Sequence, residues 1–554
     1  MRNTSVLLLI LLARLRAEQF LHHDLTLDAA GNIVSWLPPP AGAAFSAFAV
    51  RSAYWFAHQV PDDPATGLPI YYTHGQIPFV HWPHTPSRFT SWAVAAGATL
   101  LAYAGDDVLL RTIGLPHSRY MAGPNGSAPS GWVWQGAAFA SSDPGELLYR
   151  GANASSYSNC AAACCTPGQS CPGDGVNHTE PDKAANVGLA YARLFMIYGD
   201  EAQLANALTT ADVLVANEVV PANATRSPWP FRVNAQSGAA VEAYTSSVTD
   251  ALRLFDALHV ISRVAGAAKV PRLREYRATS ARVIAWLRAF PLASNSWQGV
   301  WEDVPVWASP TDDPSCHTAL DAASYLLDAA DLRGGPDAAT LAAVRTIVDW
   351  VVDVFVFQYA SSSEPAVQWG AYAVSEQACD RNKMAFHTLH FTAVAARLAN
   401  ATKNATLHEL VERSVAWSTY VLQDDNQTLI GPVDQSNWLG AGLRLPEYTI
   451  ATVASVPAWA APTQDHIVRS SGLVTAVEYQ AESISYTTYD PHSIEFLQLA
   501  RCQPTSVCAA GVQLPKVDPG SPCVGDFCAL GYWSVDGVGV TVYKTNANSI
   551  VVRC

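Results

Sequence analysis

The sequence predicts a mainly α-helical protein, built from helices that come in pairs and followed by a small β domain. Apolar residues recur every three or four positions through most of residues 43–459, which is typical of amphipathic helices. Short turns such as Gly199-Asp200 join many of these segments two by two, which indicates antiparallel helical hairpins. Beyond residue 466 the pattern changes to short runs of alternating and β-branched residues, which predicts strands.

Taken in order, the periodic segments predict about a dozen helices, or six hairpins. The two earliest helices cover residues 43–59 and 88–104. Four pairs and a last single helix follow, at residues 182–198 with 201–217, 247–265 with 271–290, 317–332 with 337–359, 376–400 with 405–422, and finally 446–459. Turns are short within the pairs, whereas the loops between pairs are long and rich in Trp and Pro. We therefore expect the long loops on one face, and a binding site there.

The last part of the chain predicts a small antiparallel β domain, stapled by disulfides. Its strand-like runs cover residues 474–479, 484–489, 494–499, 538–545 and 550–552. Nine of the eleven cysteines fall into two clusters, which are Cys160, Cys164, Cys165 and Cys171, and Cys502, Cys508, Cys523, Cys528 and Cys554. We expect disulfides within these clusters, while Cys316 and Cys379 either pair or stay free. An odd total leaves at least one thiol unpaired or bonded between chains.

The N-terminus predicts a secretory signal over residues 1–17, with a short apolar run at 6–13. Removing it leaves a helical domain over residues 18–465 and the β domain over 466–554. Seven N-x-[ST] sequons follow the signal, at Asn125, Asn153, Asn177, Asn223, Asn400, Asn404 and Asn426. Together these features predict a secreted, extracellular glycoprotein that passes through the secretory pathway.

Composition and motifs exclude several classes of function. Apolar residues make up 49% of the 554 residues and charged residues 14%, which is typical of a folded protein. The net charge is −14 and there is no basic patch, so we expect no nucleic-acid partner. The apolar run 344–357 contains Asp349 and Asp353, which favours a buried helix over a membrane span. No zinc pattern, phosphate-binding glycine loop or G-x-S-x-G motif occurs, so we expect no metal and no cofactor.

Five stretches of the sequence carry a family resemblance. They are PDKAANVGLAYARLF (181–195), SPWPFRVNAQSG (227–238), EAYTSSVTDALRLFDAL (242–258), WEDVP (301–305) and AVSEQACDRNKMAFHTLH (373–390). With the six hairpins, they resemble the six-hairpin glycosidase superfamily, particularly its secreted members without an assigned activity. The resemblance implies an (α/α)6 toroid closed by a small β domain, and an oligo- or polysaccharide substrate. That superfamily includes glycoside hydrolases, polysaccharide lyases and sugar epimerases, so fold alone does not give the reaction.

Residues 375–400 are the stretch most suggestive of a reaction centre. As one continuous helix, this stretch places Glu376, Asp380, Lys383, His387 and His390 in a single row, with small apolar residues on the opposite face. Such a crowded polar row predicts a cavity wall on which neighbouring groups shift one another's pKa. The alternative is a solvated helix start that only needs a cap and a favourable dipole.

Hydrolysis of a glycosidic bond needs two carboxyl groups, one protonated and one ionised. Glu302 and Asp303 lie in a loop on the expected site face, and adjacent side chains point in different directions. The sequence therefore predicts a glycoside hydrolase in which one of them faces Glu376. The alternative for this pair is hydrogen bonding to loop amides. The residues expected to contact the sugar are Trp229, Arg232, Tyr244, Trp301, Trp369, Asp380 and His390, although prolines and aromatics also pack structured loops.

Two other functions remain open from the sequence. A polysaccharide lyase or uronate epimerase would use His387 as base and Lys383 as the cation that neutralises the substrate carboxylate. A non-catalytic glycan-binding protein would use the same cavity without turnover. The i, i+3 spacing of His387 and His390 does not by itself make a metal site.

Four residues at helix starts carry weaker signals. Asp182 and Asp321 each follow a threonine by three positions, so we interpret both as helix caps. Lys183 and His317 lie at helix starts that border the expected cavity.

Overall fold

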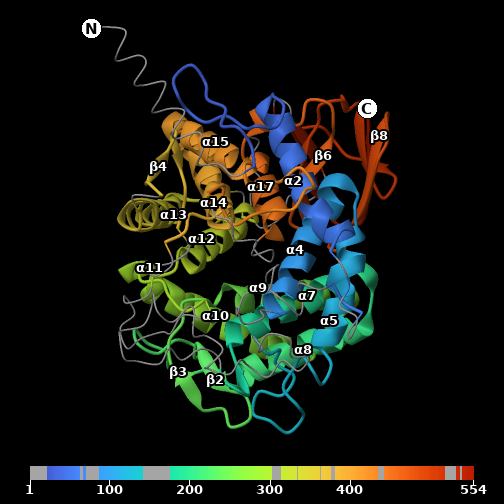
Figure 1. The fold of residues 1–554 in the computed structure, drawn as a ribbon. Coiled ribbons are helices and arrows are strands. Elements are labelled where there is room, and N and C mark those ends of the chain that lie inside the picture. The colour runs from blue at the N-terminus through green and yellow to red at the C-terminus, as the bar shows by residue number, and fades with distance from the viewer. Residues whose placement is uncertain are drawn as a thin grey trace, which may run out of the picture.

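Six helices surround a common axis in the computed structural model (Figure 1). They are α4 (Pro86–Ala104), α7 (Pro181–Tyr198), α9 (Thr249–Ala265), α12 (Cys316–Asp331), α14 (Ala385–Thr402) and α17 (Leu445–Ala454). Each contacts the next along the chain, and α17 contacts α4, so the inner ring closes. The structure describes residues 22–60, 62, 67–69, 86–140, 175–301, 314–333, 335–361, 364–375, 381–433, 442–517, 532–536 and 539–554.

A second layer of helices covers this ring from outside. It contains α2 (Ala41–His58), η1 (Leu110–Gly114) with α5 (Leu115–Met121), α8 (Glu201–Ala216), α10 (Leu273–Ala289), α13 (Ala338–Val351) and α15 (Ala405–Thr419). Each outer helix follows the inner helix that it covers, except α2, which is the first helix in the described part of the chain and packs on α17. The predicted (α/α)6 toroid is confirmed by this arrangement.

The two layers follow from the distribution of apolar residues. In α4 and α14 nearly every side chain is buried, and alanines let the neighbouring helices approach closely. In α10 only one side is buried, so this helix is amphipathic and lies outside. Side-chain caps mark the starts of three outer helices, since the side chains of Asp200, Asp337 and Asn404 each accept a hydrogen bond from a backbone amide in the first turn. Gly199 takes the left-handed conformation that ends α7, with φ of 70°.

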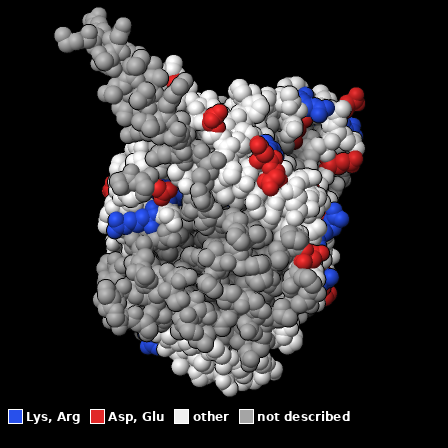
Figure 2. All heavy atoms as spheres, viewed as in Figure 1, with Lys and Arg blue, Asp and Glu red and all other residues white. Residues whose placement is uncertain are grey.

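The apolar run at residues 344–357, which the sequence predicts as a buried helix, is an outer helix with one exposed side. It forms the end of α13 and the π-helical η4 (Val352–Gln358), with Val344 and Ile347 buried and Asp349 and Asp353 exposed. Within the described ranges, no helix is both long enough and apolar enough to cross a membrane. Figure 2 shows basic and acidic side chains interspersed over the described part of one face, without a continuous basic patch there.

One predicted helix begins later than expected. The sequence predicts a helix over residues 376–400, whereas α14 begins at Ala385. Before it, Ser375 and Lys383 face each other in an isolated antiparallel bridge, and the Lys383 amide donates to the Glu364 carboxylate at 2.8 Å. Lys383 therefore does not share a helical row with His387 and His390. Residues 376–380, with Glu376 and Asp380, lie outside the described residues.

A β-sandwich follows the last helical turn, η5 (Pro457–Trp459). Its strands are β6 (His466–Ser470), β7 (Val474–Tyr479), β8 (Ser483–Thr488), β9 (Ser493–Gln498), β10 (Ser506–Ala509), β11 (Val512–Gln513), β12 (Tyr532–Asp536), β13 (Gly539–Lys544) and β14 (Ser549–Arg553). They form two antiparallel sheets, in the orders β11-β10-β14-β8-β7 and β12-β13-β9-β6. Alternate residues such as Ile484, Tyr486 and Val542 fill the space between the sheets. A disulfide joins Cys502 to Cys554.

The sandwich rests on the side of the toroid formed by α4 and α17 (Figure 1). His466 in β6 stacks on Tyr103 of α4, with ring centroids 3.7 Å apart, and its Nδ1 lies 2.7 Å from the Tyr103 carbonyl oxygen. The Tyr479 hydroxyl in β7 donates to the carbonyl of Ala102. These contacts hold β6 and β7 against the C-terminal end of α4.

A small sheet at the N-terminal end of α7 carries a buried ion network. The sheet consists of β1 (His178–Thr179), β2 (Arg232–Asn234) and β3 (Ala240–Glu242). The Arg232 guanidinium contacts Glu180 at 3.1 Å and Glu242 at 2.6 Å. The Lys183 ammonium contacts Glu180 at 2.8 Å, and all four side chains are buried. The network therefore ties the sheet to the start of α7.

Replacing Glu180 tests how much this network stabilises the fold. In Glu180→Gln, Arg232 and Lys183 lose a buried counter-charge, so we expect the free energy of unfolding in urea to fall by about 3–5 kcal/mol. Burial raises the pKa of Glu180, but the charges of Lys183 and Arg232 lower it overall below the usual 4.5. The contribution of Glu180 to stability is therefore present above pH 4.5 and lost as the pH falls below it, and the variant should lack this dependence.

The matched control is Glu275→Gln, since Glu275 is an exposed glutamate that pairs with Arg272 at the surface. We expect that variant to unfold as the wild type does. Equal stabilities of the two variants would contradict a stabilising role for the network.

Candidate active site

Aromatic and imidazole rings meet at the N-terminal ends of α12 and α14. Trp301 lies 5.4 Å from His317 and 5.4 Å from His387, measured between ring centroids, and the two imidazoles are 6.2 Å apart. His390, one turn further along α14, lies 5.1 Å from His317. We call Trp301, His317, His387 and His390 the imidazole cluster. It lies on the face where the inner helices begin, which is where the long inter-hairpin loops join them.

Burial keeps the three imidazoles neutral. All are buried, and burial together with the charge of Arg88 lowers the pKa of His387 to about 3. Burial and neighbouring charges also hold the pKa of His317 and of His390 well below the usual 6.5. His317 Nδ1 and His387 Nε2 have no hydrogen-bond partner in the part of the chain that the structure describes. Both rings can therefore offer a nitrogen to a ligand.

A carboxyl group orients two of these rings. Asp321, one turn after His317 on α12, lies 3.2 Å from His317 Nε2 and 3.5 Å from His390 Nε2. Burial raises the pKa of Asp321 to about 7, against the opposing charge of Arg253. When ionised, Asp321 favours a proton on His317 Nε2, which leaves Nδ1 as the basic nitrogen. The protonation of this carboxyl therefore changes near neutral pH.

Two cations border the cluster. The Arg88 guanidinium stacks over the Trp301 ring at 4.2 Å and donates to the Val300 carbonyl. Lys183 donates to the same carbonyl and contacts Asp182 at 2.9 Å. Burial raises the pKa of Asp182 to about 6, although the charge of Lys183 acts in the opposite direction. This side of the cluster thus has a fixed positive charge and a carboxyl that titrates near pH 6.

The structure brings together three of the residues that the sequence predicts for the site, Trp301, His387 and His390. Four others, Glu302, Asp303, Glu376 and Asp380, lie outside the described residues, so the predicted carboxylate pair stays a prediction.

Lys383 and Arg232 have other partners. The Lys383 ammonium is buried and donates to the carbonyls of Phe355 and Val356 at 2.9 and 3.0 Å, and burial lowers its pKa to about 8. Arg232 belongs to the ion network and also donates to the Trp301 carbonyl at 3.2 Å. Arg232 therefore holds the backbone of Trp301 in place through this hydrogen bond.

Three predicted aromatic residues pack elsewhere. Trp229 is buried, donates its indole N–H to the Leu214 carbonyl and packs near Phe255. Tyr244 is buried against Trp286. Trp369 lies at the turn between β4 (Val367–Gln368) and β5 (Ala371–Tyr372), where its carbonyl accepts from Ile33. The structure therefore places these rings in loop packing, outside the imidazole cluster.

Sequence reasoning missed Asp321 and Arg88 as members of the site, and it gave His317 only as a weaker candidate at a helix start. Asp321 is the sixth residue of α12, too far along the helix to cap it, and its carboxyl faces two imidazoles. The His-x-x-x-Asp spacing of His317 and Asp321, together with histidines on another inner helix, is the signal that could have found them.

Comparison with known proteins supports the fold. No known protein family matches the chain in sequence, and neither does any curated protein. Among solved structures, the cellobiose 2-epimerase of Spirochaeta thermophila is 12% identical, with a TM-score of 0.50 over 74% of this chain and 96% of that one. A sugar epimerase from a ruminal bacterium is 11% identical, with a TM-score of 0.47 over 74% and 99% of the two chains.

A family 15 glucoamylase from Hypocrea jecorina is 12% identical, with a TM-score of 0.44 over 75% of this chain and 72% of that one. These neighbours are carbohydrate-active enzymes of different reaction classes. At such identities the likeness shows the fold alone. The chain therefore has an (α/α)6-toroid fold.

Proposed function

We propose that this chain is an enzyme that epimerises or isomerises a saccharide, with the imidazole cluster as its reaction centre. The observation that carries the proposal is the pair of neutral, buried imidazoles, His317 and His387, with ring centroids 6.2 Å apart. Each has a ring nitrogen without a hydrogen-bond partner among the described residues. Two such bases on neighbouring helices can remove a proton from a sugar carbon and return it.

The reaction follows from the positions of the charged groups. One imidazole takes the proton from the carbon next to the sugar carbonyl, and the electron pair moves onto the carbonyl oxygen as an enolate. The Arg88 guanidinium, which stacks over Trp301, is the cation beside the cluster that would stabilise that oxygen. The developing negative charge also raises the proton affinity of the nearby imidazole, which burial alone holds low. Return of the proton, to either face or to the neighbouring carbon, completes epimerisation or isomerisation.

Each remaining member of the cluster has a part in this reaction. Asp321 holds the His317 proton on Nε2, so that Nδ1 is the base. Trp301 supplies an apolar surface for the sugar ring beside the two imidazoles. A lyase would use the same base and cation but would expel a leaving group. In either case Arg88, rather than the predicted Lys383, supplies the positive charge, because Arg88 stacks on Trp301 of the cluster, whereas Lys383 binds two carbonyls of η4.

Hydrolysis of a glycosidic bond is the second candidate, and one observation favours it. The ionised Glu180 lies beside Asp182, whose pKa is about 6, so two neighbouring carboxyl groups are held in different protonation states. A glycosidase needs such a pair. The predicted pair of Glu376 with Glu302 or Asp303 would serve the same reaction. Glu180 is committed to Lys183 and Arg232, which is why we place hydrolysis second.

We also propose that the protein is secreted and glycosylated. The predicted signal at residues 1–17 supports secretion. Three sequon asparagines among the described residues, Asn125, Asn223 and Asn400, are exposed, and the Cys502–Cys554 disulfide suits an oxidising compartment.

The proton-transfer proposal predicts deuterium exchange. Wild-type protein incubated in D2O with a panel of reducing mono- and oligosaccharides should place deuterium on the carbon next to the carbonyl, detected by NMR. His387→Asn should slow this exchange about 100-fold or more, because a positioned base contributes on that scale. The control is His259→Asn, which changes an exposed histidine on α9.

Other outcomes separate the alternatives. New reducing ends without exchange would support hydrolysis, and a product with new ultraviolet absorbance would support elimination. Saturable sugar binding without any turnover would support a glycan-binding protein. Any of these three results contradicts the epimerase proposal.

The raised pKa of Asp321 predicts how kcat/KM depends on pH. Because burial raises its pKa to about 7, the carboxylate that orients His317 forms as the pH rises through 7, and kcat/KM should rise with it. In Asp321→Asn, kcat/KM should no longer rise as the pH passes 7, and its value above that pH should be about tenfold or more below that of the wild type.

The free energy of unfolding should fall as the pH rises, whereas kcat/KM should increase. A carboxyl whose pKa is raised on folding makes the protein less stable as the pH rises from about 3.8 to about 7. Asp321→Asn should lack this loss. A variant that keeps the wild-type pH–rate profile would show that Asp321 does not act on His317.

A further inference from the structure

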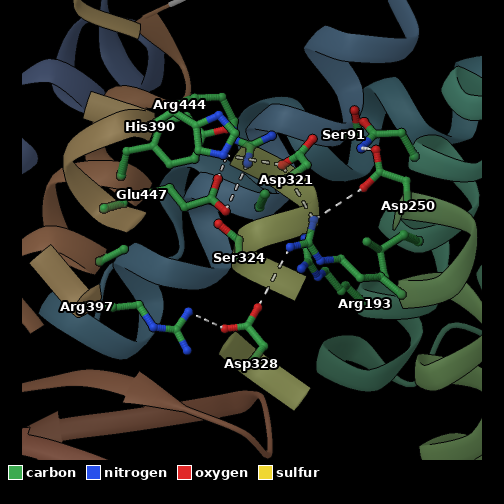
Figure 3. A pocket seen from close by; sticks show the side chains of 17 residues that line it. Ser91, Arg193, Asp250, Asp321, Ser324, Asp328, His390, Arg397, Arg444 and Glu447 are labelled. Atoms are coloured by element: carbon green, nitrogen blue, oxygen red, sulfur yellow. Dashed lines mark hydrogen bonds and ion pairs between the residues drawn. The ribbon is translucent and has the colours of Figure 1, made fainter. Parts of the chain in front are cut away.

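A cavity of about 150 Å3 lies on the axis of the toroid, on the far side of the imidazole cluster from Trp301. All six inner helices contribute to its wall, and Arg444, the residue before α17, completes it. His390, which belongs to the cluster, and Asp321 form the wall between this cavity and the other cluster residues. In Figure 3 the side chains of Arg193, Asp250, Asp321 and Asp328 come from α7, α9 and α12 and gather around this one space. The proposed reaction does not use this cavity.

Two guanidinium groups in the wall lack direct hydrogen bonds. Arg193 of α7 makes no hydrogen bond or ion pair with any residue that the structure describes, and its side chain reaches the cavity (Figure 3). Arg253 of α9 lies 3.7–3.9 Å from the carboxylates of Asp250, Asp321 and Asp328. Those distances are too long for hydrogen bonds, so its N–H donors remain available.

The acidic groups around the cavity already have other partners. Asp250 accepts from the Asn186 amide at 2.7 Å, and Asp328 accepts from Arg397 at 2.8 Å. Glu447 pairs with Arg444 at 2.5 Å. Arg193 is thus the cation whose charge no contacting carboxylate neutralises within the described residues. Its pKa is lowered by burial and by the charges of Arg253 and Arg444, against the pull of Glu447.

The cavity has access to solvent away from the imidazole cluster. Asp328, in the last turn of α12, has a side chain that is 54% exposed, and it also lines the cavity. Arg397, in the second half of α14, lines the same end. A small ligand can therefore arrive at the C-terminal ends of the inner helices without passing the proposed reaction centre.

We propose that this axial cavity is a binding site for a small tetrahedral oxyanion, such as phosphate or sulfate, held by Arg193 and Arg253. A planar guanidinium matches an oxyanion with two parallel hydrogen bonds, and two such groups on neighbouring helices form a clamp. Water occupies about 30 Å3 per molecule, so the cavity accommodates one oxyanion and a few waters. The anion would neutralise Arg193 and link α7 to α9. This site is separate from the proposed reaction centre and does not depend on the reaction proposed there.

Anion binding is measured without any assay of turnover. We would titrate the full chain with sodium phosphate by calorimetry and by thermal unfolding, at constant ionic strength maintained with chloride. A site in the folded state makes Tm rise with the logarithm of the phosphate concentration. Arg193→Gln should weaken phosphate binding at least tenfold. Arg345→Gln, which removes the same charge from an exposed position on α13, should leave it unchanged.

A second variant should change the phosphate affinity in the opposite direction. Asp328→Asn removes a negative charge from the rim and releases Arg253 and Arg397, so phosphate should bind more tightly than in the wild type. A merely structural role of these ion pairs would not produce that gain. If Arg193→Gln does not fold, Arg193→Lys, which keeps the charge but lacks the planar fork, takes its place and should also bind more weakly.

Three results would overturn the proposal. They are the absence of saturable phosphate binding to the wild type, unchanged affinity in the Arg193 variant, and weaker or equal affinity in Asp328→Asn. None of them bears on the deuterium-exchange test, which decides the proposed function separately.

Discussion

The buried ion network of Glu180, Lys183, Arg232 and Glu242 is the interaction on which the site face depends. Buried charges are stable only when their partners are well placed, so this network holds β2 and β3 against the start of α7. Two cations of this network, Lys183 and Arg232, also bind the neighbouring loop. Lys183 donates to the Val300 carbonyl and Arg232 donates to the Trp301 carbonyl. Trp301 is therefore held against the imidazoles by charges that belong to another hairpin.

Burial also determines the protonation of the groups on the axis. The same low-polarity surroundings lower the pKa of His387 to about 3, raise that of Asp321 to about 7 and raise that of Asp182 to about 6. Neutral bases and protonatable carboxyls thus coexist near pH 7, as acid–base catalysis requires. Asp321 belongs to both regions of the axis, since it contacts His317 in the cluster and Arg253 in the cavity.

The fold and the chemistry are separate conclusions. Closure of the ring through α17 and α4 defines the toroid, and a solved cellobiose 2-epimerase shares this fold. What distinguishes this chain is the set of side chains that its inner helices direct to the axis. The reaction proposed here accordingly rests on the geometry of His317, His387 and Arg88, and the anion site on Arg193 and Arg253.

The sequence by itself determined most of the helices and strands, because their periodicity is local: β7 covers the predicted residues 474–479, and α7 begins within one residue of its predicted start. It also named Trp301, His387 and His390 as site candidates, and the structure brings these three side chains together. Only the tertiary structure decided that α14 begins at Ala385, because the partner that holds the Lys383 amide, Glu364, comes from a separate loop. It alone decided the role of Asp321 as well, since a local pattern interprets that carboxyl as a cap, whereas its pKa and its histidine partners arise from helices that meet only in the folded ring.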